Sequence, residues 1–504
     1  MASAHQAEKA PHPALSADDS LGDRHGVHDP DPDPNEVYWD GNADPSNPMN
    51  WSAKYRWCHV GFISLLTFVT SLASSMLAPA VHDVMKSLGS DDTKLESFVV
   101  SIYVIGFAIG PLIVAPLSEL YGRAIIYHVT NVIFLGVTIG CALSTNVGMF
   151  LAFRFISGCA GVTPLALGGG TIGDLMPPER MGTAMAIWGL GSLVAPVFSP
   201  IAGGYLSQDA GWRWIFWVIA IPMAILTILS PFLIHETYAP VLLEAKTRRL
   251  RKETGNPQLK SRLDPGVSRQ EVVITALIRP PRLLLTSFVV TIIAMYVAVV
   301  YGYQYLVFTT LAYIFQDKYH LSTGSSGLVY LGTGIGTILG IFTIGLAADK
   351  VTERKKKKAS ALSEQIPPEE YLWPMVPSSL VAPIGLFWYG WSLQTNASPA
   401  VPLVGLGVFG FAMMGIFQPA QVYLVNSFSI HSASALAAMN ILRSLAGGLL
   451  PLAGHGLYDA LGMGWGNSLL AFIALAFAPV PFLLMKYGAR MRKKDRNIKG
   501  SQSR

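Results

Sequence analysis

The sequence predicts an all-α membrane protein with about twelve transmembrane helices, and three features of the chain lead to this fold class. Of the 504 residues, 51% are hydrophobic and only 13% are charged, and the mean hydropathy is +0.42. Soluble domains carry about a quarter charged residues. From Tyr371 to Leu442 the chain contains no Asp, Glu, Lys or Arg. The apolar runs are continuous rather than alternating, which disfavours a transmembrane barrel.

The apolar runs form two groups of six. Each run is close to the ~20 residues that a helix needs to cross the hydrocarbon core, and a charged segment from Glu236 to Arg282 separates the two groups. Six spans, a linker and six further spans indicate an internal duplication. We expect the spans at approximately 57–79, 97–117, 124–143, 149–172, 183–207, 214–234, 285–312, 325–348, 373–394, 401–425, 434–457 and 466–486.

The same pattern divides the chain into five regions. The Asp-Pro repeats of residues 29–34 lie in a polar stretch that holds too little apolar surface to fold. In the linker, leucines among bases at 241–252 predict a basic amphipathic helix on the membrane surface, and residues 253–268 are compatible with a solvated segment. The regions are a disordered cytoplasmic tail at 1–50, a six-helix bundle at 51–235, a cytoplasmic linker at 236–283, a second six-helix bundle at 284–488 and a basic cytoplasmic tail at 489–504.

The distribution of basic residues predicts that both termini are cytoplasmic. With the N-terminus inside, thirty of the 36 Lys and Arg residues fall on the inner side and four fall on the outer side. The other two, Arg154 and Arg443, fall within or at the edge of spans. Cytoplasmic loops are enriched in Lys and Arg, so this bias sets the orientation.

The sequence contains no motif of the common enzyme classes. A Gly-x4-Gly-Lys-Ser/Thr phosphate loop, a nucleophile elbow, a dinucleotide fingerprint and a Cys/His metal cluster are all absent from it. Cys58, Cys141 and Cys159 lie in apolar runs without metal or redox spacing. We therefore expect no enzymatic activity, no cofactor, no metal and no nucleic-acid partner, and we expect a monomer in the lipid bilayer.

The turn between the second and third spans carries the most specific motif. The apolar run ending at Leu117 is followed by Glu119 and then by Gly122-Arg123, and the next apolar run begins at once. The acid and the base must lie in the headgroup region while both flanking helices stay in hydrocarbon, and Gly122 permits the tight turn. A degenerate copy, with Asp349 in place of the acid, lies between spans eight and nine.

Arg154 lies near the outer start of the fourth span, and Asp174 lies at its cytoplasmic end. At about 1.5 Å per residue they are some 30 Å apart and cannot pair. Asp174 is level with Arg123, so we predict an Arg123–Asp174 ion pair that locks the cytoplasmic face of the first half; a solvated Asp174 is the alternative. Because a charge deep in the bilayer costs at least ~2.5–3.5 kcal/mol, Arg154 should face the protein interior or a wet cavity, unless it snorkels to the interface.

The fifth span contains two prolines four residues apart, Pro196 and Pro200, and then Gly203-Gly204. Each proline removes a helix hydrogen bond and kinks the helix, while small residues let a neighbouring helix approach closely. The pattern predicts a kinked and closely packed helix.

Aromatic, methionine and amide side chains in spans seven and ten predict a deformable apolar pocket. Positions 301, 305 and 308 share a helix face, and such side chains suit varied lipophilic ligands. Core packing or an interfacial aromatic belt would give the same pattern. The predicted cavity residues are Tyr301, Gln304, Tyr305, Phe308, Met414, Phe417 and Gln418.

No Asp or Glu lies in the middle of an expected span, so a proton carrier does not stand out. His455 is the deepest titratable group of the second half, where it either packs or relays protons. Asn396-Ala-Ser398 is a glycosylation sequon on the predicted outer side.

Together these motifs resemble those of one family, the fungal branch of twelve-helix drug:proton antiporters in the major facilitator superfamily. The similarity covers nearly all of residues 45–495. In the loop motif the family's usual Asp is Glu119 and its upstream Gly is Ala115, and in the antiporter motif of span five two glycines are replaced by Ala195 and Ser199.

The resemblance implies two pseudo-symmetric six-helix bundles around a central cavity that opens to either side in turn. It also implies proton-driven export of small hydrophobic compounds such as drugs, toxins or secondary metabolites, most often across the plasma membrane. It associates Arg154 with proton coupling. The gating residues that it implies are Glu119, Gly122, Arg123, Asp174 and Asp349.

Two other functions are compatible with the residues. A proton-coupled importer or facilitator of a polar nutrient is supported by Gln304, Gln418, Gln421 and Asn440. A sensor or scaffold that does not transport would be expected to have long soluble tails, and the tails here are short.

Overall fold

The computed structural model describes residues 35–41, 43–90, 92–264, 266, 268–361, 367–428 and 432–502. The chain divides into two compact parts. The larger part comprises residues 39–242 and 265–504 and contains the apolar helices, and the smaller part comprises residues 1–38 and 243–264. Residues 1–34 of the predicted disordered tail lie outside the described residues.

The smaller part contains a two-stranded parallel sheet. Strand β1 (Glu36–Val37) pairs with β2 (Lys260–Ser261), and Glu36 is aligned with Lys260. The prediction of disorder up to residue 50 is therefore wrong for β1, because the strand gains backbone partners from the linker, and also for η1 (Pro48–Asn50) in the larger part. The predicted amphipathic helix is present as α9 (Ala239–Thr254).

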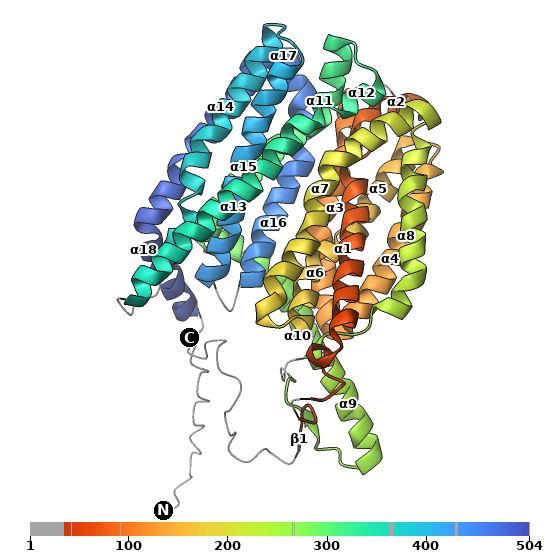
Figure 1. Ribbon diagram of the computed structural model, residues 1–504, viewed down its shortest axis with the longest axis vertical. Coiled ribbons are helices and arrows are strands. Elements are labelled where there is room, and N and C mark those ends of the chain that lie inside the picture. The colour runs from red at the N-terminus through yellow and green to blue at the C-terminus, as the bar shows by residue number, and fades with distance from the viewer. Residues whose placement is uncertain are drawn as a thin grey trace, which may run out of the picture. The chain divides into compact units, whose positions relative to one another are not determined.

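The first six spans are helical over nearly the whole of each predicted apolar run (Figure 1). Two of them are divided into shorter elements: α1 is followed by η2 and α2, and α5 passes directly into α6. The elements are α1 (Ala53–Ser75), η2 (Ala78–Ala80), α2 (Val81–Ser87), α3 (Thr93–Tyr121), α4 (Arg123–Ala142), α5 (Val147–Gly161), α6 (Thr163–Leu175), α7 (Pro178–Ala210) and α8 (Arg213–Leu233).

The second six spans follow the same plan, and α13, α14 and α15 run side by side (Figure 1). The linker contributes a further helix, α10, which the sequence did not predict and which begins with a capping box made by Ser268 and Glu271. The elements are α10 (Arg269–Thr286), α11 (Phe288–Tyr319), α12 (Thr323–Gly327), α13 (Tyr330–Ala361), η3 (Pro368–Leu372), α14 (Met375–Gln394), α15 (Ala400–Phe428), α16 (Ser432–Leu449), η5 (Leu450–Ala453), α17 (Gly454–Phe477) and α18 (Pro479–Gln502).

These helices provide the twelve crossings that the sequence predicts. By length and composition, ten stretches of the described residues could cross a membrane. One of them, Ser432–Arg492, holds two spans, because the helix is interrupted at Gly462, where φ is 73° and ψ is 171°. The ten stretches do not include α14. The indole and phenol side chains at 388, 389 and 391 lower the hydropathy of this helix.

The two halves contact each other directly at the end predicted to be extracellular. The Ser101 hydroxyl of α3 donates to Gly448 O at 2.8 Å, and the Gln208 carboxamide of α7 accepts from Gly324 N at 3.0 Å. At the opposite end, α10 contacts both α3 and α16. These two side-chain hydrogen bonds therefore join the halves at one end, and a linker helix contacts both halves at the other.

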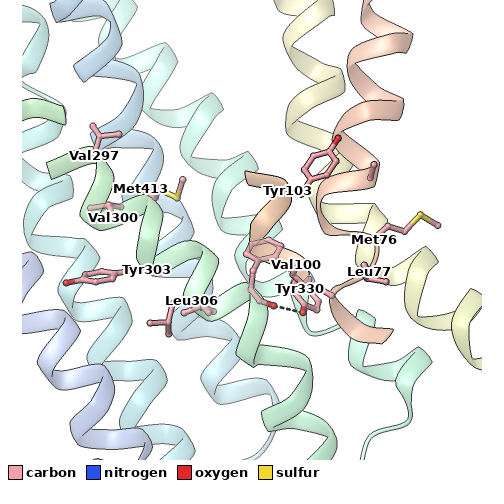
Figure 2. Packing of buried hydrophobic residues seen from close by; sticks show 14 of the residues in the cluster. Met76, Leu77, Val100, Tyr103, Val297, Val300, Tyr303, Leu306, Tyr330 and Met413 are labelled. Atoms are coloured by element: carbon pink, nitrogen blue, oxygen red, sulfur yellow. Dashed lines mark hydrogen bonds between the residues drawn. The ribbon is translucent and has the colours of Figure 1, made fainter. Parts of the chain in front are cut away.

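A continuous apolar core underlies this contact (Figure 2). It includes Leu77 from the end of the first span, Tyr103 from α3, Leu306 from α11 and Tyr330 from α13, all nearly inaccessible to solvent. The Tyr330 hydroxyl donates to the carbonyl oxygen of Phe308 at 2.7 Å, so the buried phenol is satisfied.

Candidate functional site

Gly122 makes the predicted turn between α3 and α4. Its φ of +98° lies where side chains other than glycine are strained. A Cβ at this position would also lie 2.1 Å from Glu236 Oε2. Glycine is therefore required both by the backbone conformation and by the space.

Arg123 and Asp174 form the ion pair that their heights along the helices predict. Arg123 Nε lies 2.7 Å from Asp174 Oδ2, and Nη2 donates to Oδ1 at 3.3 Å. The exposed fractions of the two side chains are 15% and 22%, so salt screens this pair less than a surface pair. The alternative of a merely solvated Asp174 does not hold, and the locking role of the pair stays a prediction.

Glu236, which follows α8, completes this cluster. Its carboxylate accepts hydrogen bonds from the backbone N–H groups of Arg123 and Ala124, at 3.0 and 3.1 Å. A negative charge thus lies at the positive end of the α4 dipole. The sequence signal was an acid placed directly after the last span of the first half, but its partner could not be read from that position. We call Arg123, Asp174, Glu236, Thr237 and Tyr238 the first-half latch.

Two further side chains tie the latch together. The Thr237 hydroxyl donates to Asp174 Oδ2 at 3.3 Å, and the Arg123 guanidinium lies over the Tyr238 ring, 5.3 Å from its centroid. Burial and then the nearby Glu119 carboxylate raise the pKa of the Tyr238 phenol, although Arg123 acts in the opposite direction. The phenol therefore stays neutral and offers its ring face to the cation.

Glu119 lies on the exposed side of α3, outside the latch. It is within electrostatic range of Arg123 and of Arg279 on the linker helix α10. The structure thus places Glu119 at the rim of the latch, next to the linker, rather than in the buried ion pair.

Asp349, the acid predicted for the second half, belongs to α13, and its side chain lies outside the described residues, so its role stays a prediction. Among the described residues, an ion pair of this half joins Glu369 of η3 to Arg492 of α18, with Nε and Nη2 each donating to a carboxylate oxygen at 2.8 Å. Glu369 is 5% exposed. We call Glu369 and Arg492 the second-half latch. The sequence feature that could have pointed to it is an acid just before the long uncharged stretch.

Arg154 of the first half is fully buried, with an exposed fraction of 1%. Its Nη1 donates to Ala73 O at 2.7 Å and its Nε to Val99 O at 3.4 Å. The guanidinium lies 4.7 Å from the centroid of the Tyr103 ring. A snorkelling arginine would reach water, so the alternative is excluded and the side chain faces the interior, as expected; its part in proton coupling stays a prediction.

The proline and glycine residues of span five lie where the two halves meet. Pro196 and Pro200 do not end the helix, since α7 runs from Pro178 to Ala210. A Cβ at Gly203 would lie 1.8 Å from Met76 O of the first half, and one at Gly204 would lie 2.6 Å from Thr323 O of the second half. The missing side chains therefore let α7 approach both halves closely.

A small cavity lies between α11 and α15, with a volume of about 10 Å³, close to the room that one water molecule needs. This is far below the ~300–1,000 Å³ of a site for a drug-sized ligand, so the cavity does not hold such a molecule as it stands. Figure 2 shows three of its apolar residues, Val297 and Val300 on α11 and Met413 on α15. The lining residues are Val297, Val300, Tyr301, Met413, Ile416 and Phe417.

The predicted cavity residues divide into two groups. Tyr301 and Phe417 line the cavity, and the Tyr305 ring packs at a tilt against that of Tyr301, with centroids 5.0 Å apart. The prediction is wrong for Phe308, which is buried against Tyr330 with centroids 5.0 Å apart.

The prediction is also wrong for Met414, which is 5% exposed and packs toward Gly340 of α13. Both errors have one cause: sequence spacing does not give the rotation of a helix about its axis. Gln304 and Gln418 are half-buried outside the cavity lining, so their role stays a prediction. Asn396 is exposed at a left-handed turn, with φ of 55°, and its glycosylation also stays a prediction.

Comparison with known proteins adds the family. The model of the Major Facilitator Superfamily matches residues 63–451. MFS-type transporter tndD of Aspergillus flavipes is 48% identical over 92% of this chain and 86% of its own. MFS-type transporter penM of Penicillium rubens is 46% identical over 91% and 90%, and efflux pump radE of Floropilus chiversii is 45% identical over 92% and 86%.

Solved structures share the fold at low sequence identity. The xylose transporter XylE from E. coli, in a partially occluded inward open conformation, has a TM-score of 0.59 at 16% identity and covers 86% of this chain and 98% of its own. A bacterial homolog to the human lysosomal transporter Spinster, inward-facing and unoccupied, has a TM-score of 0.56 at 16% identity and covers 88% and 99%.

Proposed function

Since the chain belongs to the major facilitator superfamily and is a multi-pass membrane transporter rather than an enzyme, we propose that it exports small hydrophobic compounds in exchange for protons by alternating access. The observation that carries the proposal is the asymmetry between the two ends of the large part. The halves contact each other directly at one end, and each half has a charged latch at the other.

Alternating access needs two rigid bodies that can tilt about a shared contact. The glycines of α7 and the Ser101–Gly448 contact supply a close meeting of the halves near the predicted outer end. Each latch joins elements of its own half only, so each half can move as a unit. The arrangement supports a cavity that opens toward the predicted cytoplasmic end.

A lipophilic substrate is supported by residues of α11 and α15 in the second half. The cavity between these two helices is lined by apolar and aromatic side chains, and Tyr305 extends this surface by packing against Tyr301. Apolar walls with few polar groups bind ligands mainly through the hydrophobic effect. Among the relatives, one is named an efflux pump, which supports the outward direction.

Proton coupling is supported by the first-half latch. Arg123 is close to one paired carboxylate, Asp174, while the Glu236 carboxylate caps α4. A proton on Asp174 would remove the ion pair, so uptake of a proton and release of the latch are linked. We place the protein in the plasma membrane as a monomer, with lipid as its surroundings and both termini cytoplasmic by the positive-inside rule.

Transport into sealed vesicles tests the proposal. The purified protein is reconstituted, a pH gradient is imposed, and the uptake of a panel of lipophilic and polar solutes is measured. We expect a lipophile to move in the direction opposite to the protons, and we expect a protonophore to abolish this movement. Accumulation of a polar nutrient instead would favour the importer, and movement of lipophiles that ignores the gradient would refute proton coupling.

A further inference from the structure

Arg443 of α16 is a cation without an acidic partner among the described residues. Its guanidinium carbon lies 4.5 Å from the centroid of the Tyr301 ring and 4.8 Å from that of Phe417. The cation is therefore held between aromatic rings of α11 and α15, two of the residues that line the cavity. Ring faces accept no directed N–H hydrogen bond of ordinary strength, and within the described part of the chain the buried Nε has no hydrogen-bond partner.

Asn440, three residues before Arg443, lies on the same side of α16. Its Oδ1 is also buried and has no hydrogen-bond partner within the described residues. The oxygen and nitrogen of a carboxamide have nearly the same shape, so a half-turn of the amide presents its NH₂ group at the same place. An anion bound beside Arg443 would then receive donors from both side chains.

Arg154 of the first half also has a buried N–H group without a hydrogen-bond partner among the described residues. Two of its nitrogens donate to the carbonyl oxygens of Ala73 and Val99, and the third, Nη2, is buried without a partner in the part of the chain that the structure describes. The residue is 1% exposed, so water cannot easily supply the missing acceptor.

Tyr305 connects the two cations. It lies within electrostatic range of Arg154 and of Arg443, and its hydroxyl lies beside those of Ser74 and Tyr301. Ser74 belongs to α1 and Tyr301 to α11, so Tyr305 lies where the two halves meet. Both arginines therefore lie within electrostatic range of one tyrosine at the place where the two halves meet.

This region carries positive charge that the protein does not compensate. The sequences of α1, α5 and α16 contain no Asp or Glu, and the acid of α11, Asp317, lies in its last turn. The helix α3, which packs against both α5 and α16, has its acids in its first and last turns: Glu96, which is hydrogen-bonded to His82, and Glu119. A buried charge is costly unless it is paired. Two buried cations with unused N–H donors lie where the halves meet. An acceptor from outside the protein would satisfy these donors.

We infer that Arg443, together with Asn440 and Arg154, binds the anionic group of a lipophilic substrate, a carboxylate in the first instance. The apolar body of the substrate would lie against Tyr301 and Phe417. Guanidinium groups match carboxylates with two parallel, charge-assisted hydrogen bonds. The inference rests on the proposed export function and names the substrate class for the same cavity.

An anionic substrate also accounts for the lack of acids in the middle of the spans. A fixed carboxylate in the cavity would repel the substrate, whereas the two arginines attract it. An anion that leaves the cell is driven outward by the inside-negative membrane potential, in addition to any proton gradient. Charge on the substrate thus adds driving force in the direction of export.

Binding of three matched probes tests the inference. Purified full-length protein in uncharged detergent is titrated with pyrenebutyrate, its methyl ester and the corresponding amine, and tryptophan quenching gives each dissociation constant at neutral pH. We expect the acid to bind at least about tenfold more tightly than the ester, equivalent to about 1.4 kcal/mol, and the amine to bind most weakly. Equal binding of acid and ester would overturn the inference.

Variants separate recognition of charge from folding. Arg443→Gln should remove the preference for the acid while binding of the ester stays within about twofold, and Arg443→Lys should keep part of the preference, since a lysine offers charge without the planar fork. Arg213→Gln is the matched control: Arg213 also lies over an aromatic ring, Trp212, but at the predicted outer surface. A preference that survives Arg443→Gln would refute the assignment.

A lipid phosphate could supply the same anionic chemistry. The titration is therefore repeated with phosphatidylserine and with phosphatidylcholine added to the detergent. Competition by the anionic lipid alone, lost in Arg443→Gln, would identify a headgroup as the natural anion, and absence of competition would identify the solute. Because the assay uses no pH gradient, its outcome is independent of whether transport is coupled to protons.

Discussion

The two halves of the protein each have a latch at the same end, but the charges are exchanged. In the first half the base, Arg123, begins the third helix and the acid Glu236 follows the sixth. In the second half the acid, Glu369, precedes the third helix of that half and the base, Arg492, lies in its last. In the first half the acid after the sixth helix caps the third helix through backbone N–H groups, whereas in the second half the two side chains form an ion pair.

The balance of charge also differs between the latches. The first-half latch pairs one guanidinium with one carboxylate, Asp174, and has a second carboxylate, Glu236, at the start of α4, whereas the second-half latch is a single bidentate pair. Proton uptake by the first leaves one carboxylate still ionised, but in the second it leaves Arg492 without a partner. The comparison indicates that the first-half latch is suited to respond to protons and that the second is suited to hold its half together.

Breaking the second-half latch should give the largest effect. Glu369→Gln leaves the Arg492 guanidinium largely buried without its counter-charge, and removing one partner of a buried pair typically costs ~3–5 kcal/mol. The thermal unfolding midpoint in detergent should fall clearly. The double variant Glu369→Gln/Arg492→Gln should recover part of the lost stability. If Glu369→Gln alone were as stable as the wild type, the pair would not stabilise the second half.

Gly122→Ala should give the next largest effect, because it strains the first-half latch. The positive φ and the approach to the Glu236 carboxylate predict a loss of about 1–3 kcal/mol, together with a loss of vesicle transport. Gly136→Ala, in the same helix, is the control, since a Cβ there meets nothing within 4 Å. Equal behaviour of the two variants would contradict the requirement for glycine at the turn.

Asp174→Asn tests whether the first-half latch responds to protons. The variant keeps the shape of the side chain and the Glu236 cap, so the loss of stability should be modest, about 1 kcal/mol for a weakened hydrogen bond. Transport should fall several-fold and should depend less on pH than in the wild type. Asp174→Glu should retain some pH dependence. Normal transport by Asp174→Asn would exclude a role for the pair in gating.

Glu119→Gln should give the smallest effect. The side chain lies on the exposed side of α3, where substitutions usually change stability by less than ~0.5 kcal/mol. Transport should stay within about twofold of the wild type, with unfolding and transport measured as for the other variants. A large loss would move the proton-responsive group from Asp174 to the rim beside the linker helix α10.

The sequence by itself determined the membrane class, the twelve spans and the level of each charged group along its helix. Arg123 and Asp174 could be paired in advance because the rise of a helix is fixed per residue, and Gly122 could be placed at a turn because apolar runs ended on both sides of it. These features depend on local geometry and on the cost of placing charge in hydrocarbon.

Only the tertiary structure decided which way each helix faces. Phe308 and Met414 were expected in the cavity and pack in the core instead, and the buried acid Glu369 has a partner, Arg492, that the sequence did not predict. Rotation of a helix about its axis is set by packing against its neighbours, and spacing along the chain carries little information about it. The placement of Tyr305 near both Arg154 and Arg443 depends on the same packing, because the contact joins residues from opposite halves.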